Sequence, residues 1–183
     1  MKSRQLRTVA VLLAVSLAAM GCGRDDTKSN ASDDTSGSSS KGGAFINPAD
    51  DCEDYQPTAG IKGDTITIGT VRPTSGPAGI YKFVADGMIK YFEAQNAKGG
   101  IKAGDGKTYK VEVEAGDDGY DANKTPDVVK DLVEQKNVFA LVGSIGTATN
   151  LAVRQYVNDK CVPSIALATG SPEWGKANDY PWY

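Results

Sequence analysis

Three short segments of this sequence combine glycine with hydroxyl side chains at points where a predicted strand passes into a predicted helix. They are residues 73–77, 143–147 and 168–173. The first turn of a helix carries backbone N–H groups without intrahelical partners, and the helix dipole there favours negative charge. Such an end suits a carboxylate or a phosphate, and the hydroxyls of Thr147 and Thr149 can add donors. The alternative is that each hydroxyl only caps its own helix.

The elements that must position these segments alternate between strand and helix. Runs of β-branched or alternating apolar residues predict strands at residues 65–71, 108–115, 138–142 and 162–168. Apolar residues at helical spacing predict helices at residues 79–97 and 147–158. A further helix with an apolar stripe at 128–133 is predicted to begin near Thr125, with Asp121 as an alternative cap one turn earlier.

This order of elements predicts an α/β fold with a parallel sheet sandwiched by helices. Ligands of such sheets bind outside the carboxyl ends of the strands. The three hydroxyl-bearing segments all lie at that edge, which favours a shared binding site over three independent caps. In the helix at 79–97 we expect one broad face to be buried, consisting of Ile80, Val84, Met88, Tyr91 and Phe92 with Phe83 and Gly87 beside them.

Histidine is absent from the 183 residues. That absence removes Ser-His-Asp and Cys-His nucleophile systems, histidine-ligated metals and histidine proton transfer. We therefore expect a binding protein, not an enzyme, with no cofactor and no metal. A dinucleotide site at 143–146 lacks the G-x-G-x-x-G spacing. A calcium loop at 117–123 is also disfavoured, because Gly119 falls too early for that pattern.

The first 21 residues indicate export. Lys2, Arg4 and Arg7 precede an apolar run at residues 9–20, which is the order of a secretory signal peptide and is too short to span a bilayer. The small residue directly before Cys22 resembles the lipobox of bacterial lipoproteins, in which cleavage leaves an acylated cysteine. We therefore expect a protein anchored to the membrane by lipid and facing outside the cytoplasm. The alternative is an ordinary signal peptide with Cys22 as an incidental thiol.

The composition after Cys22 separates a tether from a folded part. Residues 23–43 contain almost no apolar side chains and predict a flexible tether, and a transition segment leads from it to residue 57. The folded part is expected at 58–183. Loss of three cations with residues 1–21 would lower the net charge from −3 to −6, which argues against nucleic acid as a partner. Cys52 and Cys161 form an even pair that favours a disulfide, with two free thiols as the alternative.

Several motifs follow one another in a characteristic order. They are Ser75-Gly76-Pro77, residues 96–101, Asp117-Asp118, Val142-Gly143 and the stretch 162–173. Together they resemble the first lobe of the leucine/isoleucine/valine-binding family of periplasmic solute-binding proteins. The resemblance covers roughly residues 64–183 and implies the type I, two-lobed periplasmic-binding fold. It also implies delivery of a ligand to an ABC permease.

The resemblance assigns roles to individual positions. Thr147 matches the residue that holds the α-carboxylate of the ligand, and the carbonyl of Ala168 matches the acceptor of its ammonium group. Either Thr169 or Gly170 matches the next binding position, depending on a one-residue shift. Tyr81 matches an aromatic wall of the side-chain pocket, with a core-facing helix residue as the alternative. The floor of the pocket matches Ile145 and Gly146, and a disulfide common in the family cannot form because its places here are Tyr120 and Gly146.

These features predict a solute-binding lipoprotein that captures an amino acid or a similar small carboxylate or amide for an ABC importer. Family members carry a second lobe that closes over the ligand, and this sequence ends before one begins. We therefore expect the sequence to represent a truncated first lobe. The alternatives are the ligand-binding domain of a sensor or receptor, and a non-functional gene fragment.

Overall fold

The structure, a computed structural model, describes residues 52, 55–175 and 179–183. The predicted signal peptide at 1–21, Cys22 and the predicted tether lie outside the described residues. The described part belongs to one unit, Ser40–Tyr183. Among the described residues, no helix has both the length and the apolar character needed to cross a membrane.

The sheet is built around β2 (Thr65–Val71), which lies between β4 (Thr108–Gly116) and β5 (Leu141–Val142). Strand β6 (Ser164–Ile165) follows β5, and all of these pairings are parallel. The ladder of β2 with β4 runs from the pair Thr65 and Lys110 to the pair Val71 and Gly116. The carboxyl ends of these strands therefore meet at one edge, as the sequence predicts.

Two short strands were not predicted. β1 (Ile61–Lys62) and β3 (Ile101–Lys102) pair antiparallel with β2 and β4 respectively. Each has only two residues, so neither carries a readable alternation. The strands β5 and β6 are shorter than the predicted 138–142 and 162–168, although Phe139 donates its N–H to the Thr67 carbonyl at 2.7 Å. The parallel α/β fold itself is confirmed.

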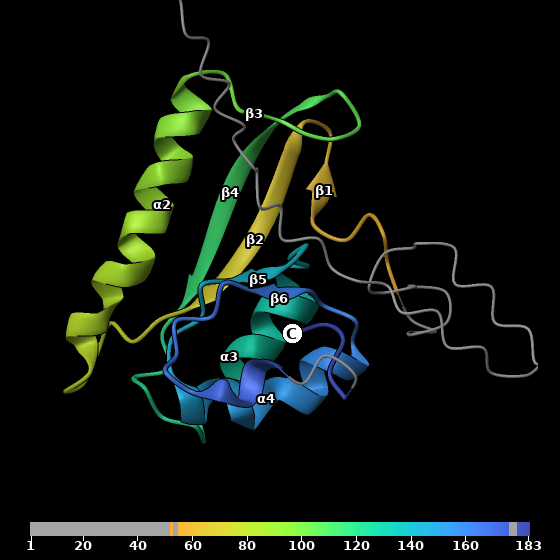
Figure 1. The fold of residues 1–183 in the computed structure, drawn as a ribbon. Coiled ribbons are helices and arrows are strands. Elements are labelled where there is room, and N and C mark those ends of the chain that lie inside the picture. The colour runs from red at the N-terminus through yellow and green to blue at the C-terminus, as the bar shows by residue number, and fades with distance from the viewer. Residues whose placement is uncertain (1–51, 53–54, 176–178) are drawn as a thin grey trace, which may run out of the picture. The chain divides into compact units, whose positions relative to one another are not determined.

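The helices cover both faces of the sheet. The first predicted helix consists of a 3-10 turn, η1 (Gly79–Tyr81), and α2 (Lys82–Ala97). Helix α3 (Thr125–Lys130) passes into a π-helical turn, η2 (Asp131–Gln135), and α4 (Thr147–Asp159) follows β5. The chain crosses from β2 to β4 in one direction along the sheet, and from β4 to β5 and from β5 to β6 in the opposite direction. Because such crossovers are right-handed, α2 lies on one face of the sheet, and α3 and α4 lie on the other (Figure 1). A short 3-10 helix, η3 (Pro172–Gly175), lies after β6.

The hydrophobic core lies between the sheet and the pair α3 and α4. It is aliphatic, and each such side chain contributes about 1.5–3 kcal/mol when fully buried. Its members are Val71, Val129, Leu132, Val138, Leu141, Val153, Val157 and Val162. This core joins Val71 at the end of β2 to the middle and last turn of α4, through Val153 and Val157.

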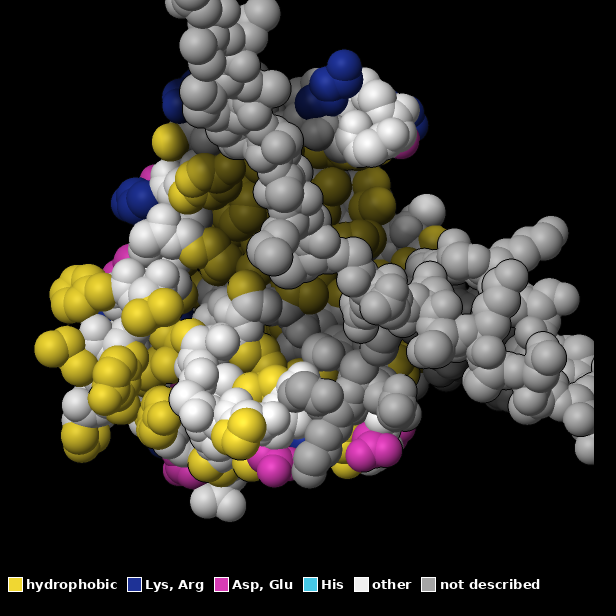
Figure 2. Space-filling view, in the orientation of Figure 1, with side chains coloured by type: hydrophobic (Ala, Val, Ile, Leu, Met, Phe, Trp, Pro, Cys, Tyr) yellow, Lys and Arg dark blue, Asp and Glu magenta, His cyan; other side chains and the backbone are white. Residues whose placement is uncertain are grey.

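The predicted buried face of the first helix is wrong for most of its residues, although Met88 and Phe92 are half-buried. Ile80 is 69% exposed, and Phe83, Val84 and Tyr91 are also exposed, so hydrophobic side chains gather along the outside of this helix (Figure 2). Ala85 is the buried residue of α2. Apolar residues occupy both sides of this helix, and for that reason helical spacing could not select the side that contacts the sheet. An ion pair between Arg72 and Asp86 joins α2 to the end of β2.

Asn96, a polar residue near the end of α2, bonds to the sheet. Its side chain donates to the Val111 carbonyl at 2.8 Å and accepts the Val111 N–H at 2.9 Å. Strand β3 pairs with β4 only at Tyr109 and Thr108, so Asn96 hydrogen-bonds the edge of β4 beyond that pairing. The side chain therefore ties α2 to the sheet and satisfies backbone groups at the same time.

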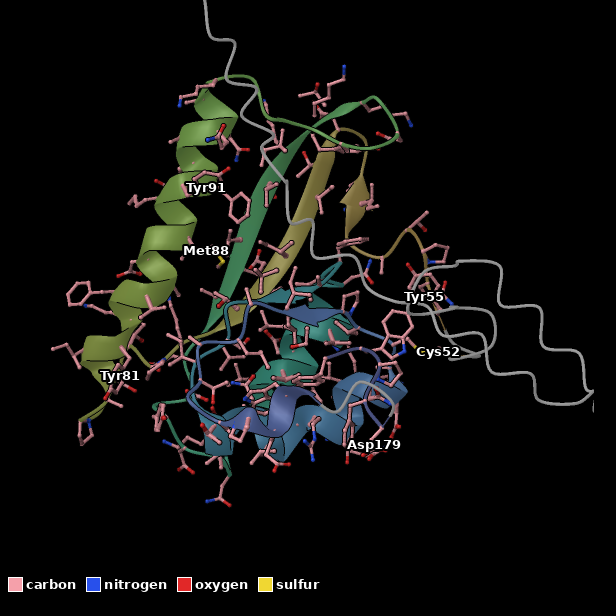
Figure 3. All side chains as sticks on the ribbon, viewed as in Figure 1. Cys52, Tyr55, Tyr81, Met88, Tyr91 and Asp179 are labelled. Atoms are coloured by element: carbon pink, nitrogen blue, oxygen red, sulfur yellow. A yellow bond between two sulfur atoms is a disulfide. The ribbon has the colours of Figure 1, made fainter. Side chains whose placement is uncertain are left out.

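A disulfide joins Cys52 to Cys161, with Cα atoms 6.1 Å apart and a sequence separation of 109. It ties the segment before β1 to the turn before β6. Nearby, the rings of Tyr55 and Trp182 lie 5.1 Å apart, and the Trp182 carbonyl accepts the Ser164 N–H at 2.7 Å. Cys52 and Tyr55 lie well away from Tyr81 at the start of α2 (Figure 3).

We predict that Cys52→Ala, Cys161→Ala and the double variant will be destabilised by the same amount, about 4 to 5 kcal/mol. The reason is that the bridge closes a loop of 109 residues and so restricts the unfolded chain. Chemical denaturation of the three variants under oxidising conditions measures the effect. A Cys52→Ala variant as stable as the parent protein would show that the bridge does not constrain the chain.

Candidate ligand-binding site

The seven pocket residues predicted from the sequence come together around one cavity of about 200 Å³. The cavity lies at the carboxyl edge of the sheet, where the loops after β2, β4, β5 and β6 approach one another. Its lining consists of the seven predicted residues and one that was not predicted to contact ligand: Tyr81, Ile145, Gly146, Thr147, Ala168, Thr169, Gly170 and Tyr120. None of these side chains carries a charge at neutral pH.

The amino terminus of α4 opens into this cavity. The helix begins at Thr147 after Gly146, whose φ of 108° places it in the region that favours glycine, and no side chain caps this end. The N–H groups of its first turn therefore remain available as donors. A side chain at Gly146 would bring its Cβ within 2.5 Å of Thr149 Oγ1 and 2.7 Å of the Tyr120 ring. Residue 146 must be glycine on both counts.

Buried hydrogen bonds fix the loop that precedes α4. Ser144 Oγ accepts the Val71 N–H at 3.2 Å, which ties the loop to β2. The Asn150 side chain donates to the Gly146 carbonyl at 2.6 Å and to the Ser144 carbonyl at 3.3 Å. Thr149 donates its hydroxyl to the Ile145 carbonyl at 2.7 Å. The expectation that Thr149 adds a donor for a ligand is therefore wrong, because its hydroxyl turns back to its own loop.

The loop after β6 pairs with the loop before α4. Ile145 and Ala168 form an isolated parallel bridge, in which the Ala168 carbonyl accepts the Gly146 N–H at 3.1 Å. One lone pair of that carbonyl remains for another donor. Thr169 and Gly170 both line the cavity, and the Oγ1 of Thr169 lies 2.5 Å from Thr147 Oγ1.

The two threonine hydroxyls leave one proton for a ligand. One of them donates to the other, and Thr169 Oγ1 also accepts the Ser171 N–H at 3.3 Å. Because each hydroxyl has a single proton, one proton is used between them and the other is free. Together with the first-turn N–H groups of α4, this makes the end of the cavity rich in donors.

The first predicted segment has a different role. Asp117 accepts the N–H of Thr74 at 2.8 Å, the hydroxyl of Thr74 at 2.6 Å and the N–H of Gly119 at 3.0 Å. Partial burial raises the pKa of Asp117, but these hydrogen bonds outweigh it and hold that pKa well below its usual range. The donors of this segment therefore brace the loops after β2 and β4 together, and they do not point to a ligand.

Two tyrosines form one wall of the cavity. The Tyr81 and Tyr120 rings have centroids 6.1 Å apart and planes inclined at 34°. Tyr81 is 52% exposed, so the alternative that it faces the core is wrong. The sequence indicated Tyr120 only as a position where similar proteins carry a disulfide-bonded cysteine. The signal that could have found it is its position two residues after Asp118, in the loop that follows the carboxyl end of β4.

A second hollow, of about 300 Å³, lies at the opposite edge of the sheet near Tyr55. It is lined partly by apolar residues that include Val138, Phe139 and Val162, and it has no uncapped helix end in its lining. Within the described residues, no group of three or more acidic or cysteine side chains could hold a metal ion. The smaller cavity is therefore the better candidate for recognition of a polar ligand.

Comparison with known families agrees with this geometry. Residues 65–183 match the model of a family described as periplasmic binding protein. The chain belongs to the periplasmic binding protein family. The matched residues contain β2 to β6 with their helices, and they include every residue of the candidate site. Comparison with curated protein sequences gives no match.

Solved structures similar to this periplasmic binding protein include transport proteins. A possible leucine/isoleucine/valine-binding protein from Rhodopirellula baltica is 23% identical, with a TM-score of 0.57, covering 69% of this chain and 32% of that one. That likeness concerns the fold alone. The branched-chain amino acid transporter substrate-binding protein from Streptococcus pneumoniae, in complex with isoleucine, is 27% identical with a TM-score of 0.54, over 63% of this chain and 32% of that one.

A third similar structure carries a different ligand. The solute-binding protein of an ABC transporter from Rhodopseudomonas palustris, in complex with 3,4-dihydroxybenzoic acid, is 25% identical with a TM-score of 0.53. The match covers 64% of this chain and 31% of that one. The chain thus spans about a third of the length of the solved structures it matches.

We predict that Asp117→Asn will lower the free energy of unfolding by about 1 kcal/mol at pH 7, a value reduced for the exposure of the loop. The folded-state pKa is depressed, so the charge stabilises fully above the ordinary pKa of 3.8 and the effect fades as pH falls below it. Denaturation curves between pH 2 and pH 7 measure this. The exposed carboxylate of Glu112, changed to Gln, serves as the control. A deficit in Asp117→Asn that stays constant with pH would contradict the argument.

Proposed function

We propose that this periplasmic binding protein is an extracytoplasmic solute-binding component of an ABC importer. Its ligand would be an amino acid or a similar small carboxylate or amide. The observation that carries the proposal is the uncapped amino terminus of α4, which opens into the cavity beside the paired hydroxyls of Thr147 and Thr169. Family membership and the transport proteins among the similar structures support it.

The proposed binding mode starts from the acid end of the ligand. A carboxylate at the start of α4 would accept the Thr147 N–H and the free hydroxyl proton of the threonine pair. Hydrogen bonds to a charged group contribute about 1.5–3 kcal/mol each, and the helix dipole adds about 0.3–1 kcal/mol. The remaining lone pair of the Ala168 carbonyl would accept a donor of the ligand, such as an ammonium or amide N–H.

The rest of the ligand would lie against the apolar part of the cavity. Tyr81 would form its wall and Ile145 with Gly146 its floor, and all three residues line the cavity. The lining contains hydroxyls and backbone groups but no carboxylate, amine or thiol, so the proposed role is capture without chemical change. The partner that receives the ligand is proposed to be an ABC permease.

The lipid anchor is the second part of the proposal. It rests on the sequence alone, on the cationic and apolar segment at 1–21 and the cysteine at position 22. Acylation of Cys22 would hold the binding protein at the membrane surface, close to its permease. Two acyl chains are needed for stable attachment, because a single chain gives only marginal binding.

We predict that Thr147→Val in the complete gene product will weaken ligand binding about tenfold, because the carboxylate loses one charged hydrogen bond while the volume of the side chain is kept. Isothermal titration with L-isoleucine and with 3,4-dihydroxybenzoate measures it. Thr108→Val, an exposed threonine on β4 at the other end of the sheet, is the matched control. If neither compound nor a wider panel of carboxylates and amides binds the parent protein, the proposed function is wrong.

We predict that Cys22→Ser will release the protein from the membrane fraction and abolish labelling with a radioactive fatty acid. The expected result follows because the anchor chains are attached through the sulfur of Cys22. Immunoblots of membrane and soluble fractions, with Cys52→Ser as a control cysteine, make the measurement. Retention of the Cys22→Ser protein on the membrane would contradict the lipid anchor and leave solute capture untouched.

A further inference from the structure

We propose that the second hollow, beside the disulfide of Cys52 and Cys161, is the docking site of this chain's own residues 44–46. In that arrangement the predicted tether leaves the folded part at the edge of the sheet opposite the candidate ligand-binding site. The docking depends neither on the identity of the ligand nor on acylation of Cys22, so it goes beyond the proposed function. It is inferred from the lining of the hollow and from the place where the described chain begins.

The second hollow has an apolar lining that is not fully covered. Its apolar side chains include Val133, Val138, Phe139, Val162 and Pro163. Of these, Val133, Phe139 and Pro163 are only half-buried, so part of their surface still faces water. Another apolar side chain in the hollow would remove that surface from water, which is favourable. The hollow therefore suits a short apolar segment.

The described chain begins at the border of this hollow. Cys52 is bonded to Cys161, which lines the hollow, and Tyr55 lines it as well (Figure 3). The Tyr55 ring is also held by Trp182, at a centroid distance of 5.1 Å. Two points of the chain, three residues apart, are thus fixed at the hollow. The residues that precede Cys52 must start from there.

Residues 44–46 have the composition and the reach to fill the hollow. Phe45 and Ile46 are the only bulky apolar side chains in the sequence between Cys22 and Cys52. Ile46 stands six positions before Cys52, and six residues extend to at most about 20 Å. A short flexible connection gives its end an effective concentration in the millimolar range. A weak apolar contact is therefore enough to hold the segment in place.

Charge favours the same segment over other apolar occupants. Residues 50, 51, 53 and 54 flank Cys52, and all four are acidic. Lys160 is an exposed residue of the lining and directly precedes Cys161. The acidic residue of the lining, Glu134, accepts the Tyr156 hydroxyl at 2.9 Å. The disulfide thus brings an acidic run to a lysine, and a lipid chain or an unrelated apolar peptide would lack this match.

Photo-crosslinking of the purified complete gene product tests the docking directly. p-Benzoyl-L-phenylalanine replaces Phe45, and mass spectrometry locates the linked residues after irradiation. We expect crosslinks to the lining of the hollow, such as Val133, Phe139 and Pro163. The same probe in place of Asn30, within the predicted tether, is the matched control and should give at least tenfold fewer crosslinks to these residues.

Chymotrypsin measures the same contact without a probe. Cleavage after Phe45 should be at least tenfold slower than in a synthetic peptide of residues 40–51, because a docked side chain must leave the hollow before it enters the protease. Ala59→Met enlarges a side chain of the lining and should remove most of this protection. Ala152→Met, at an exposed alanine of α4 outside the hollow, is the matched control and should keep it.

Two results would overturn the inference. One is a set of crosslinks from position 45 that falls outside the hollow or joins two copies of the chain. The other is cleavage of the parent protein as fast as that of the peptide. Both measurements keep the parent side chains of the hollow, so they decide the matter even where Ala59→Met does not fold. Ligand titration is a separate readout, and failure of the docking leaves the proposed function standing.

Discussion

The left-handed backbone of Gly146 is the constraint on which the candidate site depends. It lets the chain turn from β5 into α4 without a capping side chain, so the first-turn N–H groups of α4 face the cavity. Two side chains fix this turn. Asn150 of α4 donates to the Gly146 carbonyl, and the Ser144 hydroxyl accepts the Val71 N–H of β2. A site that binds through backbone groups requires this rigidity, because a shift of the loop would move every donor at once.

The aromatic wall is positioned by a separate set of interactions. Asp117 joins the loop after β2, which leads to Tyr81, to the loop after β4, which carries Tyr120. The donor end depends instead on β5, α4 and the bridge between Ile145 and Ala168. The central strand β2 contacts both ends of the cavity: Val71 bonds to Ser144 at the donor end, and the ladder with β4 supports the aromatic wall. A change to one end of the cavity can therefore alter recognition there while the other end keeps its geometry.

The sequence predicted the edge of the sheet better than the faces of its helices. Alternating strands and helices require a parallel sheet, and a parallel sheet brings residues as distant as Tyr81 and Thr169 to one edge. The outward side of α2 was not predictable, because Ile80 and Val84 have the spacing of a buried face and are exposed. The role of Tyr120 was hidden for another reason: it depends on a φ of 65° and on Asp118, and neither is visible in a pattern of apolar residues.

The hydrogen-bonding groups of the cavity are mostly donors. Its donors are the first-turn N–H groups of α4 and one free hydroxyl proton from Thr147 and Thr169. Its exposed carbonyl acceptor is the single remaining lone pair of Ala168. A group rich in acceptors, such as a carboxylate, satisfies several of these donors at once. The donor groups at the start of α4 therefore suit the acid end of the proposed ligand.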